Sequence, residues 1–189
     1  MSPRWALFLS GRGSNAQALL NQLDLIDVRL VVTSQMAAAG VRKARRMGIP
    51  VVLWKKATPW QEMDHELRAR GISHLFLLGF MRLVPGEFCE AWRGRIWNLH
   101  PSLLPHYPGA HAMENSFSDR AEMGVTIHEV TAEMDAGPIC RQERVWSRSQ
   151  LSQVGSEDWP NIQMAMSMAE QRNVRMWAEF LNLKGAPNE

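Results

Sequence analysis

The stretch IWNLHPSLLPHYPGAHA, from Ile96 to Ala112, places two side chains that could do chemistry at the end of an apolar run. Residues at i and i+2 of a strand face the same side, so we expect Asn98 and His100 to share a cleft while Leu99 points into the core. An amide donor beside an imidazole suits acyl-type transfer, in which an oxyanion is held and an amine loses a proton. A histidine that only bonds to nearby backbone is the alternative. The loop with three prolines favours the chemical interpretation, because ordering such a loop costs backbone entropy.

A second candidate is the glycine-rich segment LSGRGSN, which predicts a strand, a tight turn and a helix that opens at Ser14 and Asn15. Free amides at a helix start, together with the positive end of the helix dipole, favour an anion. The dinucleotide fingerprint fails because Ala16 stands where the third glycine belongs, and no Walker Gly-Lys-Ser/Thr follows. A small phosphate monoester is the better prediction. A plain strand–helix turn with a serine cap is the alternative.

A third candidate is Asp135, which lies in a predicted turn between two strands. A carboxylate near His100 would orient the ring and raise the pKa of the imidazole. Asp is also ordinary in turns, and spacing alone does not bring the two residues together. His128 alternates with Ile127 and is a candidate for the same cleft. No pair of histidines has metal-ligand spacing, so we expect no metal, and no nucleophile elbow surrounds Ser102.

The elements that must position these residues follow from the alternation of apolar runs and amphipathic segments. The expected strands span 5–10, 28–34, 49–54, 73–79, 95–100, 123–130 and 137–146, and the expected helices span 15–23, 37–48, 58–71 and 85–94. In the third helix we expect Thr58 as the cap and Pro59 as the first helical residue. The tail from 158 to 183 is loosely helical. This pattern predicts an α/β fold of the doubly wound, Rossmann-like kind, a mostly parallel sheet with helices on both faces.

Doubly wound sheets bind ligands at the carboxyl ends of their strands. The rule indicates three places in this chain, namely Ser10–Asn15, Gly79–Val84 and the loop that begins at Asn98. We find no repeat, low-complexity tract or linker, and so expect a single domain over residues 1–189.

Composition narrows the class of protein. The 189 residues are 46% hydrophobic and 21% charged, as in soluble globular proteins. A net charge of +2 argues against a nucleic-acid partner, and the cluster RKARR at 42–46 is predicted to be the solvated face of a helix. Cys89 and Cys140 form no disulfide or metal pattern, which favours the cytoplasm. No segment approaches the roughly 20 apolar residues of a membrane span, and the N-terminal run is predicted to be a strand instead of a signal peptide.

Four motifs stand in the order and spacing of the folate-dependent formyltransferases, which the chain resembles over roughly residues 4–145. They are SGRGSN, GFMRLV, NLHPSLLPHYPGAHA and GVTIHEVTAEMDAGPI. The resemblance implies transfer of a formyl group from 10-formyltetrahydrofolate, used as a co-substrate without metal. It implies glycinamide ribonucleotide of purine biosynthesis as the amine acceptor. The implied partner is therefore a small phosphorylated amine, with no nucleic acid or membrane involved and with a monomer or homodimer as the assembly.

The resemblance also implies a role for individual residues. Asn98 would hold the formyl oxygen, His100 would transfer the proton, and Asp135 would raise the pKa of His100. The residues that bind the substrate would be Gly13, Ser14 and Asn15, at its phosphate, and Glu170. The residues that line the folate pocket would be Met81, Arg82, Leu83, Val84, Asn98, Val130, Thr131, Ala132, Glu133, Met134 and Asp135. The Leu104–Pro105 bond is expected to be cis.

The chain also departs from the family pattern. Trp60 stands where the purine enzyme presents an arginine to the folate, and Arg12 lies between the two glycines of the phosphate turn. Residues 110–124 lack the family's helix motif, and the surroundings of Glu170 lack its His and Tyr-Pro. The alternatives are therefore another amine acceptor, such as an amino sugar phosphate or nucleotide sugar, a formyltetrahydrofolate hydrolase, or a non-catalytic folate- or phosphate-binding protein.

Overall fold

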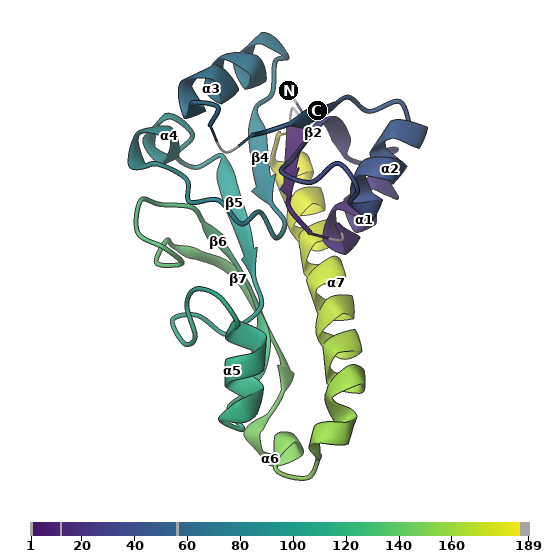
Figure 1. Ribbon diagram of the computed structural model, residues 1–189, viewed down its shortest axis with the longest axis vertical. Helices are drawn as coiled ribbons and strands as arrows, with labels where there is room; N and C mark the ends of the chain where they lie inside the picture. The colour runs from purple at the N-terminus through teal and green to yellow at the C-terminus, as the bar shows by residue number, and fades with distance from the viewer. Residues whose placement is uncertain (1, 12, 56, 186–189) are drawn as a thin grey trace.

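The computed structural model describes residues 2–11, 13–55 and 57–185, so Arg12 lies outside the described residues. Within these ranges seven strands form one sheet in the order β3-β2-β1-β4-β5-β6-β7 (Figure 1). The strands are β1 (Arg4–Leu9), β2 (Asp27–Thr33), β3 (Val51–Leu53), β4 (His74–Leu77), β5 (Ile96–His100), β6 (Met123–Glu129) and β7 (Ile139–Trp146). The pairs among β1 to β5 are parallel, whereas β6 pairs antiparallel with both β5 and β7. The predicted mostly parallel, doubly wound sheet is confirmed.

Helices cover both faces of this sheet. They are α1 (Ser14–Leu20), α2 (Ala39–Arg46), α3 (Trp60–Ala69), α4 (Gly86–Ala91), α5 (Ala112–Ser118), α6 (Arg148–Leu151) and α7 (Trp159–Gly185), with a 3₁₀ turn η1 (Ser156–Asp158). Side chains of β1 alternate between two buried clusters, as the period of a strand requires. Trp5, Leu7 and Leu9 pack with α1, α2 and α7, whereas Ala6 and Phe8 pack with α3 and α4 (Figure 1).

Three local expectations were wrong. Pro59 is the cap of α3, with an extended ψ of 147°, and the helix begins at Trp60, so Thr58 is not the cap. The serine cap considered for α1 is replaced by Gly13, which has a left-handed φ of 75° and makes no side-chain cap bond. The family's helix motif is absent after Gly109, yet α5 forms there and begins directly after His111, which has a left-handed φ of 59°.

The topology brings the ends of β1, β4 and β5 to one edge of the sheet. The loops that follow β1 and β4 are tied together, because Ser10 N–H donates to the Gly79 carbonyl and Met81 N–H donates to Ser10 Oγ, both at 3.1 Å. Along the antiparallel pair of β5 and β6, Asn98 lies directly opposite His128. The sheet therefore places residues that are 30 positions apart in the chain next to one another.

Candidate active site

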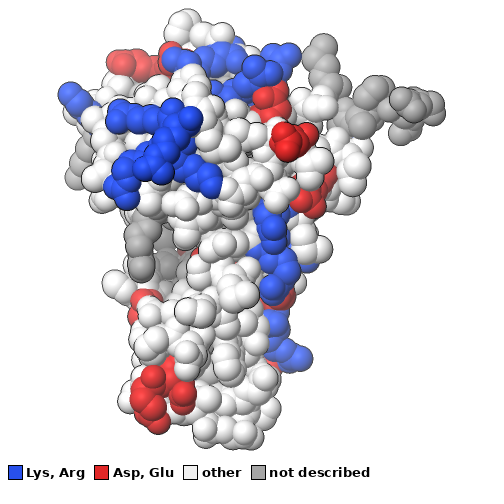
Figure 2. Space-filling view, turned by 90° about the vertical axis from the view of Figure 1, so that its right-hand side faces the viewer, with Lys and Arg blue, Asp and Glu red and all other residues white. Residues whose placement is uncertain are grey.

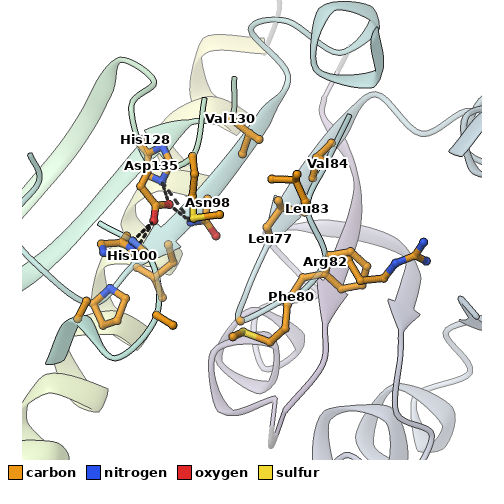
Figure 3. Close-up of a pocket in the computed structure, with 18 of the residues that line it drawn as sticks. Leu77, Phe80, Arg82, Leu83, Val84, Asn98, His100, His128, Val130 and Asp135 are labelled. Atoms are coloured by element: carbon orange, nitrogen blue, oxygen red, sulfur yellow. Dashed lines mark hydrogen bonds and ion pairs between the residues drawn. The ribbon is translucent and has the colours of Figure 1, made fainter. Parts of the chain in front are cut away.

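A cleft of about 470 Å³ opens at this edge of the sheet. Its walls include Gly79–Val84 on one side and Asn98–Pro101 with most of the loop Val130–Asp135 on the other (Figure 3). Asn15 and Glu170 also line it. These are the places that the strand-end rule indicates. Three residues predicted for the site do not line the cleft, namely Gly13, Ser14 and Ala132. The methyl group of Ala132 faces Gly86 instead of the cleft.

Asp135 is the centre of a buried polar cluster on one wall of the cleft (Figure 3). Its Oδ2 lies 3.3 Å from His100 Nδ1 and accepts the Gly109 N–H at 2.8 Å. Its Oδ1 lies 3.4 Å from both His128 Nε2 and the Asn98 amide nitrogen. The side chains of His100 and Asp135 are only 5% and 10% exposed. Tertiary structure therefore brings Asp135 to Asn98 and His100, which the sequence spacing alone did not do.

The second ring nitrogen of His100 has a backbone partner. Nε2 lies 2.8 Å from the Tyr107 carbonyl oxygen, so it must carry a hydrogen and donate it. In the neutral ring, Nδ1 is then a bare acceptor that faces the Asp135 carboxylate. A proton between His100 Nδ1 and Asp135 Oδ2 would therefore have an acceptor on either side.

The acid–base properties of this pair differ from the prediction. Burial lowers the pKa of His100 below its usual 6.5, although the Tyr107 carbonyl and the Asp135 charge both act to raise it. Asp135 thus acts in the predicted direction, but the net shift of the His100 pKa is downward, because desolvation outweighs the carboxylate. Burial alone would raise the pKa of Asp135, yet hydrogen bonds from His128 and the Gly109 amide, together with the charges of the two histidines, hold it below its usual value. At neutral pH this site contains a base and an ionised carboxylate.

Asn15 and Glu170 form a second polar group that lines the cleft. Asn15 Nδ2 donates to Glu170 Oε2 at 3.0 Å, which joins the start of α1 to the middle of α7. Asn15 Oδ1 is buried and has no hydrogen-bond partner within the described residues. Burial raises the pKa of Glu170, with the Asn15 hydrogen bond acting against it. The pair thus offers an acceptor oxygen and a carboxyl group to a polar ligand.

The opposite wall carries a clamped arginine. The Arg82 guanidinium carbon lies 5.6 Å from the ring centre of Trp54 and 5.4 Å from that of Trp60, and its Nη1 donates to the Lys55 carbonyl at 3.1 Å. Trp60 is held in turn against Phe88, with ring centres 4.8 Å apart. Trp60 stands where the family has an arginine, so this wall has one cation fewer. The Trp60 ring also contacts Arg82, however, and so helps to position that cation.

The rim of the cleft is apolar and open. Met81, Leu83 and Met134 are 76%, 67% and 59% exposed, although each lines the cleft. Exposed apolar side chains around a concave site are typical of ligand-binding surfaces. No group of three or more His, Cys, Asp or Glu in the described ranges could hold a metal ion. Among the same residues no helix is long and apolar enough to cross a membrane.

One partner of His100 could not be predicted from the sequence, because it is a backbone atom. The Tyr107 carbonyl has no sequence signal, although Tyr107 adopts a left-handed φ of 55° to present it. His128 was a candidate only through its alternation with Ile127. The Leu104–Pro105 peptide bond in the intervening loop is cis, as the resemblance implied.

Comparison with known protein families gives a clear match. A family model described as formyl transferase matches residues 3–152. The phosphoribosylglycinamide formyltransferase of Escherichia coli is 34% identical over 153 residues, covering 74% of this chain and 71% of the relative. The Bacillus subtilis protein of the same name is 32% identical over 75% of this chain and 78% of its own length. The human trifunctional purine biosynthetic protein adenosine-3 is 36% identical, but the match spans only 15% of that longer protein.

Solved structures agree with the sequence matches. Glycinamide ribonucleotide transformylase 1 from Geobacillus kaustophilus aligns with a TM-score of 0.84 at 29% identity, over 98% of this chain and 100% of the other. The phosphoribosylglycinamide formyltransferase of Anaplasma phagocytophilum aligns with a TM-score of 0.83 at 30% identity, over 95% and 89%. A formyltetrahydrofolate deformylase from Pseudomonas syringae shares only 22% identity at a TM-score of 0.73, which supports the shared fold alone.

Proposed function

The chain belongs to the formyl transferase family, and on this premise we propose that it transfers a formyl group from 10-formyltetrahydrofolate to the amine of glycinamide ribonucleotide. The observation that carries the proposal is the buried cluster of Asn98, His100 and Asp135 in the cleft at the strand ends. A purely binding protein has no need for a base and a carboxylate with one proton position between them. We further infer a single formyltransferase domain over residues 1–189 that works in the cytoplasm as a monomer or homodimer.

The chemistry assigned to the cluster is the capture of charge and of one proton. As the acceptor amine attacks the formyl carbon, a C–N bond forms and the carbonyl oxygen becomes negative. The Asn98 amide N–H donates to that oxygen and stabilises its charge. The attacking nitrogen loses its proton to His100 Nδ1, where Asp135 Oδ2 stabilises the imidazolium. The same proton is passed to the folate nitrogen as its bond to the formyl carbon breaks.

Binding of the two substrates is assigned to separate walls. The donor would lie between Met81–Val84 and the loop Val130–Asp135, where the rim is apolar. The acceptor phosphate would lie at Gly13–Asn15, of which Asn15 lines the cleft, and the acceptor's hydroxyl groups would bond to Glu170, which also lines it. Arg82 would meet an anionic part of the donor, because its side chain extends away from the catalytic cluster (Figure 3).

The test is to incubate the protein with the formyl donor and glycinamide ribonucleotide and to follow folate absorbance together with formylated product. We expect stoichiometric donor loss and product formation. His100→Ala should lower turnover by at least about 10²-fold while folate affinity stays within about threefold. His65→Ala is the matched control, because His65 is exposed on α3 and lies away from the cleft.

Other outcomes would overturn the proposal in distinct ways. Donor loss without formylated acceptor would favour a hydrolase. Turnover only with an amino sugar phosphate or a nucleotide sugar would keep the chemistry and replace the acceptor. Tight folate binding without turnover of any amine would favour a binding protein. Full activity of His100→Ala would refute the proton transfer assigned to that residue.

A further inference from the structure

Helix α2 carries a compact group of cations that the reaction does not use. We call Arg42, Lys43, Arg45 and Arg46 the basic surface. Figure 2 shows a dense cluster of Lys and Arg side chains on the upper part of the face that carries α1 and α2. The prediction that this segment forms the solvent-exposed face of a helix is confirmed, since the three arginines are exposed while Val41 and Ala44 are buried.

The basic surface is not neutralised by carboxylates. Elsewhere, many arginines are paired with acidic side chains, as in Arg29–Asp27, Arg68–Asp64, Arg70–Glu66, Arg93–Glu90, Arg144–Glu122 and Arg172–Glu143. Within the described ranges no member of the basic surface has such a pair. Arg42 donates to the Ala37 carbonyl at 2.8 Å, and Lys43 donates to Asn21 Oδ1. The positive charge of this surface is therefore available to attract anions in the surrounding solvent.

The basic surface adjoins the glycine turn. Gly40, the second residue of α2, is packed so closely against Gly13 that a Cβ added at Gly13 would lie 3.0 Å from its backbone. The Arg42 guanidinium folds back to Ala37, which lies before the first residue of the helix, and so faces the end of α2 that touches the turn. Arg46 lies six residues beyond Gly40, about 9 Å along the helix axis. Most of the charge is thus within about one Debye length of the turn, which is about 10 Å at 0.1 M salt.

A structural explanation accounts for only part of this arrangement. Cations in the last turn of a helix stabilise its negative end, which suits Lys43, Arg45 and Arg46. It does not account for Arg42 in the first turn. It also does not account for the lack of acidic residues in the first turns of α1 and α2, where carboxylates would stabilise the helices. Both helices therefore lack negative charge where they meet the turn.

We propose that the basic surface draws the phosphorylated acceptor toward the Gly13–Asn15 turn by long-range attraction, without contacting it in the bound state. The inference rests on the proposed function, because it takes the acceptor phosphate to bind at that turn. Coulomb attraction in water between a phosphate dianion and three cations at a mean distance of about 10 Å, screened by salt, corresponds to about a fivefold effect at 0.1 M and about a twentyfold effect at 0.01 M. Such attraction raises the capture rate and leaves the chemical step unchanged.

The test compares two triple variants of equal charge. Arg42→Gln, Arg45→Gln and Arg46→Gln remove the charge of the basic surface, whereas Arg68→Gln, Arg93→Gln and Arg144→Gln remove three cations elsewhere. Each triple changes the formal net charge from +2 to −1. We expect kcat/KM for the phosphorylated acceptor to fall about fivefold at 0.1 M salt and about twentyfold at 0.01 M in the first triple, with kcat unchanged. The second triple should stay within about twofold at either salt concentration.

Two further measurements separate steering from damage to the fold. The dephosphorylated acceptor should show no difference between wild type and the first triple, and replacing the same three arginines with lysine should restore kcat/KM. A first triple that matches the control triple at both salt concentrations would overturn the proposal. An equal loss with the dephosphorylated acceptor, or no rescue by lysine, would also overturn it. Absence of formyl transfer in the wild type would instead refute the proposed function, so the two failures are distinguishable.

Discussion

Replacement of Asp135 by asparagine tests the shared-proton geometry most directly. Asparagine has nearly the same shape and tolerates the left-handed φ of 52° that Asp135 adopts. Its amide oxygen can still accept the Gly109 N–H. The substitution therefore removes the negative charge 3.3 Å from His100 Nδ1 while it leaves the loop in place.

The magnitude follows from this distance. A full imidazolium at 3.3 Å from a carboxylate is stabilised by about 5 kcal/mol at an effective dielectric constant of about 20. If about half of that charge has developed in the transition state, the loss is about 2.5 kcal/mol, or roughly 10²-fold in kcat. Loss of ring orientation adds to this effect, so we expect kcat to fall by about 10²- to 10³-fold.

The pH dependence of kcat/KM should show in which direction Asp135 shifts the pKa of His100. Burial places the pKa of His100 below 6.5, so the acid limb of kcat/KM should lie below that pH in the wild type. Asp135 acts to raise the pKa of His100, and therefore Asp135→Asn should move the acid limb to lower pH.

Steady-state kinetics from pH 4.5 to 8.5 would measure both quantities. Asp119→Asn is the matched control, because Asp119 is an exposed carboxylate that accepts a hydrogen bond from the Tyr107 hydroxyl and does not line the cleft. A kcat of Asp135→Asn within threefold of the wild type, or an acid limb that moves to higher pH, would refute the role given to this carboxylate.

Three further changes test other parts of the structure. Trp60→Ala frees Arg82 from one ring, so KM for the formyl donor should rise about three- to tenfold with kcat nearly unchanged, and Trp60→Phe should retain most of the affinity. Burial lowers the pKa of His74 to about 4, so the folded protein binds its proton less readily and loses stability as the pH falls below 6.5. Between pH 7 and pH 5, urea unfolding should show the wild type losing about 1–2 kcal/mol more than His74→Phe; equal losses would contradict the assignment. Gly137→Ala would place a Cβ 1.8 Å from the Glu129 carbonyl oxygen, so it should destabilise the fold by at least about 2 kcal/mol and weaken donor binding; an unchanged thermal midpoint would contradict it.

The features that the sequence alone determined are those with a local period. Successive side chains of a strand alternate between its two faces, so Leu7 and Phe8 of β1 lie on opposite faces of the sheet. By the same rule Asn98 and His100 lie on one side of β5. The glycine turn was readable because few residues adopt the φ of 75° found at Gly13. Helix ends were less accurate, as at Pro59, since a cap depends on one ψ angle that composition does not specify.

Only the tertiary structure decided how the polar cluster of Asn98, His100 and Asp135 is joined and protonated. The register of β5 against β6 places His128 opposite Asn98, and the turn beyond it returns Asp135 to His100 across 35 positions of sequence. Local spacing carries no information about such contacts. The direction of the His100 pKa shift was likewise decided by the fold, because it depends on how much solvent is removed from around the ring. The neighbouring carboxylate alone would raise the pKa of His100, but burial lowers it by more.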